Sequence, residues 1–334
     1  RNLHITTTQS QSPRRDHSAL RGFFHRYYRE SAKGGMPIGG LKRNPFSRLE
    51  SKKVSCRAQI CGILLSEQKE GEPPWPVMLK QSPIGSFPHK TVSDLEQRLD
   101  NFRVLFAYHS GKIENEEITL HDTREIFENG KVLNYTGSPR AIFEQHNQKL
   151  CYEFLKEKIA AKEPLTQELV LEVHRILTSG TYDERRFLEN GERPGEYKKH
   201  DYITGRNEVG VPADRVAEDM ADLLEEVNEY HGTDVIRAGA YFHAVFENIH
   251  PFSDGNGRTG RTLLNYYLMT HNHPPLIVYA QDKKLYYECL EKYDAEETIA
   301  PLTEFLKYET EKTWEKTLEW GERENRRKGL EKIR

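Results

Sequence analysis

Twelve consecutive residues in the last third of the chain combine the side chains that phosphate chemistry needs. They run from His250 to Arg261 and read HPFSDGNGRTGR. Gly255 and Gly257 permit backbone angles that other residues resist, so the N–H groups around them can turn towards an anion. Arg258 and Arg261 are three residues apart and share one face if the segment is helical, where both guanidinium groups can grip charged phosphates.

The remaining side chains of this segment supply a metal ligand, a base and an anchor. Asp254 offers a hard carboxylate oxygen, the ligand that Mg²⁺ takes when it bridges phosphates. The imidazole of His250 is expected to titrate near the working pH, so it can take a proton from an attacking hydroxyl. Phe252 is predicted to anchor the loop in the core. Each feature alone is common, but their combination within twelve residues favours a phosphate site.

The flanking sequences predict that this segment is a short loop between two buried helices. Apolar residues before and after it predict helices over 235–249 and 257–270. Pro251 disfavours helical geometry at the residue before it, so the first helix is predicted to end at His250. The N-terminus of the second helix adds its positive dipole end to the loop.

Most of the chain from Ser93 onwards has helical periodicity. Ser93 and Glu96 are predicted to form a capping box, and the apolar residues that follow repeat at spacings of three and four. Further helices are predicted over 121–130, 139–161, 166–178, 214–230, 282–294 and 301–322. Only residues 195–212 differ, because their turn formers and aromatic residues predict a short hairpin. The predicted fold class is therefore all-α with one short β-hairpin.

Composition excludes several classes of protein. The chain has 334 residues, of which 36% are hydrophobic, and a mean hydropathy of -0.80. No apolar run approaches the roughly 20 residues that span a bilayer, so no membrane association is expected. The four cysteines have no paired CxxC spacing and are expected to be free thiols of a reducing compartment, which indicates the cytoplasm. They are Cys56, Cys61, Cys151 and Cys289.

The first 77 residues differ in charge from the rest. They carry 14 Lys and Arg against 6 Asp and Glu, a net charge of +8, whereas the remainder carries 35 against 46. Their clustered turn formers argue against a packed core, so we expect a disordered or non-native leader, with Met78 as a candidate start. Two alternatives are an Arg-rich transit segment and a nucleic-acid-binding arm. In such an arm the residues that stack on bases would be Phe23, Phe24, Tyr27 and Tyr28.

Residues 250–261 match every fixed position of the Fic family signature, HPFx(D/E)GN(G/K)RxxR, and the resemblance covers about residues 93–310. It implies the mainly helical Fic fold and the transfer of AMP from ATP to a Ser, Thr or Tyr hydroxyl of a protein. In that reaction His250 would be the general base, Asp254 would hold Mg²⁺ or Mn²⁺, and Phe252 would fix the loop. The residues implied to bind the phosphates are Gly255, Asn256, Gly257, Arg258 and Arg261.

The resemblance also gives the predicted hairpin a role. In this family a β-hairpin flap lies over the active site and positions the target by strand addition, which uses backbone hydrogen bonds and tolerates many target sequences. The residues assigned to such a flap are Tyr197, His200, Tyr202, Ile203 and Thr204. The alternative is an ordinary surface hairpin.

A second segment, residues 110–115, is similar to the Fic inhibitory motif (S/T)xxxE(G/N). The resemblance implies that Glu114 pairs with Arg261 and denies it to the γ-phosphate, while Ser110 caps or supports the inhibitory helix. Gly111 and Asn115 are expected to fray that helix. The alternative is a solvated acidic loop.

These expectations give a layout with four parts: a leader over 1–77, a helix with the inhibitory segment over 78–120, a Fic core over 121–310 and a charged helix over 311–334. The expected partners are ATP and a protein target, self-modification included, and homodimerisation is left open. One alternative is a Fic enzyme that uses another nucleotide or phosphocholine, transfers phosphate, or removes AMP. Another is a nucleotide-sensing or nucleic-acid-binding module, although nucleic acid is not an expected partner.

Overall fold

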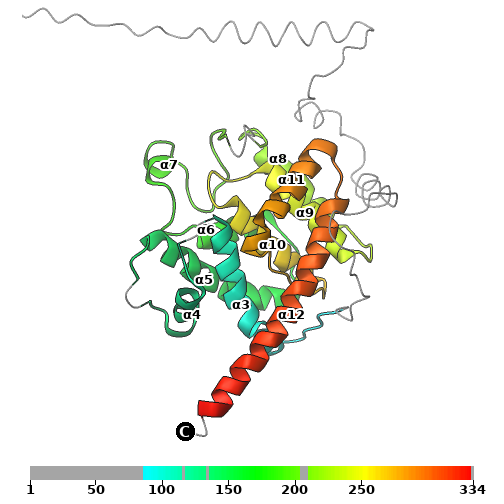
Figure 1. Cartoon of the computed structure of the whole chain (residues 1–334). Coiled ribbons are helices and arrows are strands. Elements are labelled where there is room, and N and C mark those ends of the chain that lie inside the picture. Colours follow the sequence, from blue (N-terminus) through cyan, green and yellow to red (C-terminus); the bar gives the residue numbers. More distant parts are fainter. Residues whose placement is uncertain (1–85, 115–116, 133–134, 204–209, 332–334) are drawn as a thin grey trace, which may run out of the picture. The chain divides into compact units, whose positions relative to one another are not determined.

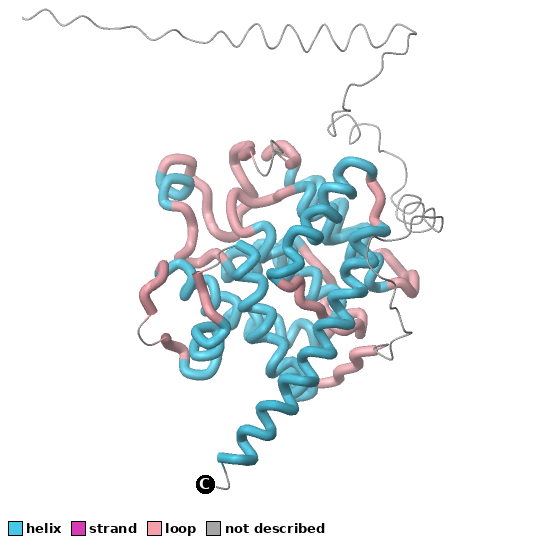
Figure 2. Tube along the Cα trace, in the orientation of Figure 1, coloured by secondary structure: helices cyan, strands magenta, loops and turns pink. Residues whose placement is uncertain are grey.

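The computed structural model describes residues 86–114, 117–132, 135–203 and 210–331. The predicted leader over 1–77, Met78, Cys56, Cys61, Thr204 and Asn115 lie outside these residues. The described part is built of helices and connecting loops, with no residue in a β-strand (Figures 1 and 2). None of its helices is long and apolar enough to cross a membrane.

Figure 1 labels the α-helices and colours them in their order along the chain. The elements are α3 (Val92–Glu114), α4 (Leu120–Asn129), α5 (Pro139–Ala161), α6 (Gln167–Leu177), α7 (Glu184–Leu188), α8 (Val216–Asn228), α9 (Val235–Ile249), α10 (Asn256–Thr270), the 3-10 helix η2 (Ala280–Asp282), α11 (Lys283–Glu296) and α12 (Ala300–Glu331).

Helix α10 is the central element of the core. Nearly all of its residues are buried, and it packs against α9, α6, α5 and α3. Its apolar residues, such as Leu263 and Tyr266, are fully enclosed, and so are the guanidinium groups of Arg258 and Arg261. Burying charged side chains is costly unless they are paired. The N-terminus of α10 is therefore a place where the fold has to supply acidic partners from other helices.

Helix α3 begins at a different cap from the one predicted. The hydroxyl of Thr91 accepts from the N–H of Asp94 at 3.1 Å, and a carboxylate oxygen of Asp94 accepts from the N–H of Thr91 at 3.2 Å. The predicted box of Ser93 and Glu96 is wrong, since Glu96 accepts from Lys156 of α5 at 2.8 Å instead. The helix starts two residues earlier than its apolar pattern suggests, because Thr91 satisfies its first free donors.

The other end of α3 is continuous through the segment that resembles the inhibitory motif. The helix runs to Glu114, so Ser110 to Glu114 are helical and do not form an acidic loop. The expected fraying at Gly111 is not seen, because α3 continues through this residue to Glu114. A Cβ at position 111 would lie 2.2 Å from the side-chain nitrogen of Gln145 on α5, so a larger residue would displace that amide.

The predicted and observed helices agree closely where apolar periodicity is strong. Helices α5 and α9 occupy the predicted ranges 139–161 and 235–249. The short helix α7 was not predicted, because it has five residues and none of them is buried. Residues 195–203 form loop and turn, and 204–209 are not described, so the predicted hairpin is not seen in the described residues. The two described cysteines, Cys151 and Cys289, are free and buried, as expected.

Candidate active site

The loop between α9 and α10 has the geometry that its sequence predicts. Helix α9 ends at Ile249, and His250 takes a left-handed conformation with φ 51°. Gly255, with φ 81°, precedes α10. The side-chain amide of Asn256 closes the loop, because its oxygen accepts from the N–H of Phe252 at 2.8 Å and its nitrogen donates to the Phe252 carbonyl at 2.7 Å. The Asn256 side chain therefore shapes the loop, and the first N–H groups of α10 are the donors that remain for an anion.

Phe252 anchors this loop against a histidine of α6. Its ring is fully buried and stacks on His174, with ring centroids 3.6 Å apart. The N–H of Gly195 donates to Nδ1 of His174 at 2.9 Å, so Nε2 carries the proton and donates to the Asp254 carbonyl, also at 2.9 Å. Burial lowers the pKa of His174 to about 4, which keeps this tautomer neutral. His174 was missed from the sequence, where it is simply a polar residue on the apolar face of α6.

We expect Phe252→Ala to lower the free energy of unfolding by about 3–5 kcal/mol, because a buried phenyl ring is replaced by a cavity beneath the loop. Urea unfolding followed by circular dichroism measures this change. Leu188→Ala on α7 is the matched control, since Leu188 is 68% exposed and its loss should change stability by less than about 0.5 kcal/mol. Equal effects of the two substitutions would contradict an anchoring role for Phe252.

His250 is largely buried. The sequence suggested a pKa near the working pH, but the pKa of this side chain in the structure is lower. Burial lowers the pKa of His250 to about 4, and the neighbouring charge of Lys198 adds to this effect. The imidazole is therefore neutral at pH 7 and able to accept a proton. Only glycine fits at position 210, because a Cβ there would lie 2.7 Å from the Cβ of His250 and 3.2 Å from Nζ of Lys198.

Two backbone hydrogen bonds, one at the start of the segment assigned to a flap and one beyond its end, link this part of the chain to the loop and to the end of α9. The N–H of Lys198 donates to the Pro251 carbonyl at 2.9 Å, and the N–H of Val211 donates to the Ile249 carbonyl at 3.0 Å. The described residues of the predicted flap make separate contacts. Tyr197 packs on Phe252, His200 and Tyr202 hydrogen-bond the carboxylate of Glu192, and Ile203 is 72% exposed.

Arg261 is held by the C-terminal turn of α3. Its Nη2 donates to Oε1 of Glu114 at 2.7 Å and to the Ser110 carbonyl at 3.1 Å, and its Nε donates to the Ser110 hydroxyl at 3.1 Å. Ser110 therefore contacts the arginine and does not cap a helix. Burial alone would raise the pKa of the Glu114 carboxyl, but the pair with Arg261 outweighs burial and holds this pKa below its usual range.

The remaining nitrogen of Arg261 faces the N-terminal turn of α10. Nη1 has no hydrogen-bond partner among the described residues. A Cβ built on Gly257 would lie 2.8 Å from this nitrogen and 2.6 Å from Oε1 of Glu114. Gly257 therefore leaves the room in which the carboxylate of Glu114 lies.

Arg258 belongs to a second charged cluster, which contains residues from α5. Nη1 of Arg258 lies 3.1 Å from the buried carboxylate of Glu144, and Nη2 lies 3.6 Å from Oδ1 of Asp254. Arg140 joins the same two carboxylates, with Nε 2.9 Å from Glu144 and Nη2 2.8 Å from Asp254. The four side chains form a closed ring of alternating charge. Neither Arg140 nor Glu144 carries a sequence signal, because they lie more than 100 residues from the loop that they contact.

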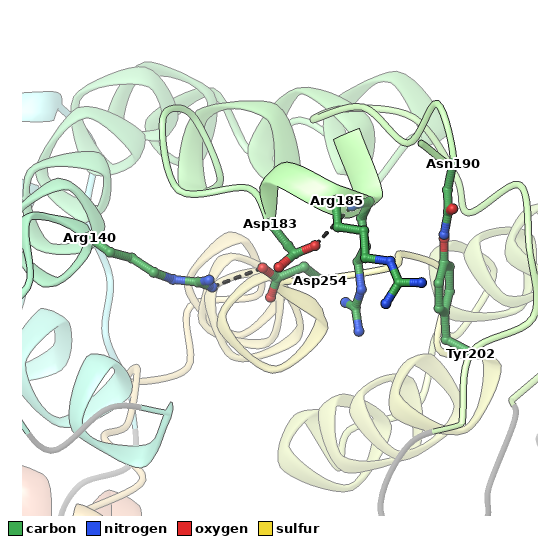
Figure 3. Close-up of a pocket in the computed structure, with 7 residues that line it drawn as sticks. Arg140, Asp183, Arg185, Asn190, Tyr202 and Asp254 are labelled. Carbon is green, nitrogen blue, oxygen red and sulfur yellow. Dashed lines mark hydrogen bonds and ion pairs between the residues drawn. The ribbon is translucent and has the colours of Figure 1, made fainter. Parts of the chain in front are cut away.

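Arg140 and Asp254 of this ring also line a pocket of about 590 Å³. Figure 3 shows the side chains around it. It is lined by Arg140, Asp183, Arg185, Arg186, Asn190, Tyr202 and Asp254. Arg186 donates to the Ser253 carbonyl and stacks over the ring of Tyr202 at 4.8 Å, so it joins the loop to the flap segment. The lining of the pocket thus contains three guanidinium groups and two carboxylates. Two of the arginines come from α7, which the sequence did not predict.

The side chains around the pocket could hold a divalent cation only if a bound phosphate supplied further oxygen ligands. Among the described residues there is no group of three or more His, Cys, Asp or Glu side chains placed to hold a metal. Mg²⁺ at nucleotide sites usually takes one or two carboxylates and completes its shell with phosphate oxygens and water. Asp254, at the edge of the pocket, is suited to that role once its arginine partners release it.

Comparison with known proteins agrees with this geometry. Residues 164–268 match the model of the Fic/DOC family, a range that contains α6 to α9, the loop and most of α10. This part of the chain is therefore a Fic domain.

The chain is 30% identical over 231 residues to a protein named "Protein adenylyltransferase Fic" from Drosophila persimilis, across 67% of this chain and 42% of that protein. It is 30% identical over 196 residues to "Protein adenylyltransferase fic-1" from Caenorhabditis briggsae, across 56% and 36%. The chain thus spans less than half the length of these curated relatives.

Solved structures share the fold. Fic-1 of C. elegans superposes with a TM-score of 0.59 at 24% identity, covering 71% of this chain and 69% of that one. A signalling protein of Bacteroides thetaiotaomicron that contains a Fic domain gives a TM-score of 0.58 at 23% identity, covering 66% and 87%. The predicted helical Fic fold is confirmed.

Proposed function

We propose that this chain is a protein adenylyltransferase, which moves AMP from ATP to a Ser, Thr or Tyr hydroxyl of a target protein. The observation that carries the proposal is the loop itself, where a neutral His250 stands beside a helix N-terminus with two buried arginines, Arg258 and Arg261. The names of the relatives, which match over two thirds of the chain, favour the same activity.

The transfer needs one base and one set of anion donors. His250 takes the proton of the target hydroxyl, whose oxygen forms a bond to the α-phosphorus of ATP as the bond from that phosphorus to the β-phosphate bridge breaks and pyrophosphate leaves. The low pKa of His250 keeps it unprotonated before ATP binds. The negative charge of the bound triphosphate then raises this pKa and makes the imidazole a stronger base.

The phosphates are bound by the first turn of α10. The free N–H groups that follow Gly255, together with Arg258, form the anion site, and Arg261 reaches the γ-phosphate. Asp254 would hold Mg²⁺ or Mn²⁺, which would supply positive charge against the triphosphate.

We also propose that α3 inhibits this reaction. The carboxylate of Glu114 is 2.7 Å from Nη2 of Arg261, so it competes with the γ-phosphate for that guanidinium. Ser110 strengthens the hold by accepting from Nε of the same arginine. With Arg261 engaged, ATP binds with its α-phosphate poorly aligned for attack.

Target binding is assigned to the segment from Tyr197 onwards. The backbone hydrogen bonds from Lys198 to Pro251 and from Val211 to Ile249, on either side of His250, support this assignment. The exposed Ile203 is available to a target side chain, and Thr204, outside the described residues, would continue the segment. We propose that a target peptide pairs with the backbone here, and that residues of this chain itself become targets when inhibition is lifted.

Labelled ATP distinguishes the candidate reactions. The full chain and its Glu114→Gly variant are incubated with Mg²⁺ and a cell extract, using ATP labelled at either the α- or the γ-phosphate. Protein that retains only the α-label supports AMP transfer, whereas retention of the γ-label means phosphate transfer. Binding of ATP without retention of either label would instead favour a nucleotide-sensing module, and release of AMP from modified protein would indicate the reverse reaction.

Asp254→Ala should raise the Mg²⁺ concentration that gives half-maximal transfer by more than about 10-fold, because loss of a ligand should cost at least as much as loss of an outer-shell partner. The measurement is the initial rate of α-label transfer across a Mg²⁺ titration. Asp183→Ala is the matched control, since Asp183 lines the same pocket and caps α7. An unchanged Mg²⁺ curve for Asp254→Ala would mean that the metal has other ligands.

A further inference from the structure

Both carboxylate oxygens of Asp254 face guanidinium groups. Oδ2 accepts a hydrogen bond from Nη2 of Arg140 at 2.8 Å, and Oδ1 lies 3.6 Å from Nη2 of Arg258. The Asp254 side chain is 20% exposed, so little of its surface is open to solvent. A cation that binds Asp254 therefore comes close to the guanidinium groups of Arg140 and Arg258.

Arg140 is held at this position by a second contact. Its Nε donates to Oε1 of Glu144 at 2.9 Å, one helical turn further along α5. The side chain of Arg140 is 40% exposed, whereas that of Glu144 is almost fully buried and also pairs with Arg258. Glu144 thus anchors a guanidinium that also lines the pocket. Figure 3 shows the Arg140 side chain extending towards Asp254.

A divalent cation and the guanidinium of Arg140 would compete for the carboxylate of Asp254. Mg²⁺ binds carboxylate oxygens directly, at about 2.1 Å, and tolerates little departure from its preferred geometry. A guanidinium that donates to Oδ2 takes one of the lone pairs through which a cation could bind. The positive charges of the guanidinium and the cation also repel each other at this short range.

We propose that Arg140 is a gate for the metal: its guanidinium competes with the divalent cation for the carboxylate of Asp254 and must leave that carboxylate when the metal and ATP bind. This inference rests on the proposed function in assigning Asp254 to the metal. It differs from the pair of Glu114 and Arg261, because it regulates the metal and does not regulate the γ-phosphate. Removal of the guanidinium should therefore tighten metal binding even if transfer is unaffected.

Binding of Mn²⁺ to the full chain tests the gate without any turnover. Free Mn²⁺ is measured by electron paramagnetic resonance in the presence of an ATP analogue that cannot be cleaved between the α- and β-phosphates. Arg140→Gln should lower the apparent Kd for Mn²⁺ by roughly fivefold or more, the lower end of a typical coupling between two sites. Arg140→Lys, which keeps the charge but has only one nitrogen to share between Glu144 and Asp254, should give a smaller decrease.

Arg185→Gln is the matched control. Arg185 lines the same pocket, but its side chain is 81% exposed and pairs with Glu189 at 2.9 Å. This substitution removes the same positive charge without touching Asp254, and Mn²⁺ affinity should change by less than about twofold because exposed charges are screened.

Three outcomes would overturn the proposal. Equal tightening in Arg140→Gln and Arg185→Gln would show that only the net charge of the pocket matters. An unchanged Kd in Arg140→Gln, with binding still lost in Asp254→Asn, would refute the gate and leave the metal role of Asp254 intact. Parent-like binding in Asp254→Asn would refute the gate together with that part of the proposed function.

Discussion

Replacement of His250 by alanine should reduce AMP transfer by about 10²–10⁴-fold, the usual cost of losing a general base, while ATP binding is retained. The anion donors lie at the start of α10 and do not depend on the imidazole, so only the chemical step should suffer. Single-turnover transfer of α-label to protein measures the rate, and equilibrium binding of ATP measures the affinity. Transfer at the parent rate would show that His250 is not the base.

The pH dependence adds a second test of the same residue. A base works in its unprotonated form, so the rate should fall as the pH drops through the pKa of His250. That pKa is lowered to about 4 before ATP binds, and kcat/KM reports the free enzyme. We therefore expect kcat/KM to show no loss assignable to His250 between pH 6 and 8. An acidic limb centred near 6.5 that disappears in His250→Ala would contradict the burial argument. His121→Ala on α4, which removes an exposed histidine, should leave the profile unchanged.

Glu114→Gly should raise the rate of AMP transfer by roughly 5–150-fold, the range of a typical coupling between two sites. The carboxylate of Glu114 and the γ-phosphate compete for one guanidinium, so removal of the carboxylate frees Arg261 without disturbing the catalytic loop. Since Glu114 is the last residue of α3, glycine there interrupts no helix. The measurement is the initial rate of α-label transfer, self-modification included.

A double-mutant cycle isolates this coupling. Combined with Arg261→Ala, the Glu114→Gly change should bring no further gain, because the shared partner is absent and the two effects cannot add. Glu96→Gln is the matched control, since it removes one acidic charge from the same helix at a residue that pairs with Lys156. If Glu114→Gly is no faster than the parent, the pair with Arg261 is structural and the enzyme is regulated in another way.

The parts of the site that could be predicted are those that the sequence places together. The residues from His250 to Arg261 are contiguous, and the loop that they form follows from Pro251 and Gly255. The flanking helices could be predicted because they are long and periodic. Glu114 was within reach only because its segment resembles a known motif, and the structure then places it against Arg261.

The partners that other helices supply could not be predicted. Arg140, Glu144 and His174 contact the loop across 80 or more residues of sequence, and nothing local distinguishes them from other polar residues on helix faces. The low pKa of His250 was also out of reach, because it arises from burial and from the charge of Lys198. These properties depend on packing, which a pattern of residue types does not record.

The clearance at Gly257 has a consequence for how such a sequence can change over generations. The signature permits either glycine or lysine at this position, but a Cβ there would meet the Glu114 carboxylate at 2.6 Å. If Glu114 inhibits as proposed, any side chain at position 257 would displace its carboxylate from Arg261 while α3 stays intact. A single substitution at position 257, within the catalytic loop, would then convert an inhibited enzyme into an uninhibited one. The inhibited state therefore constrains this position more tightly than the chemistry does.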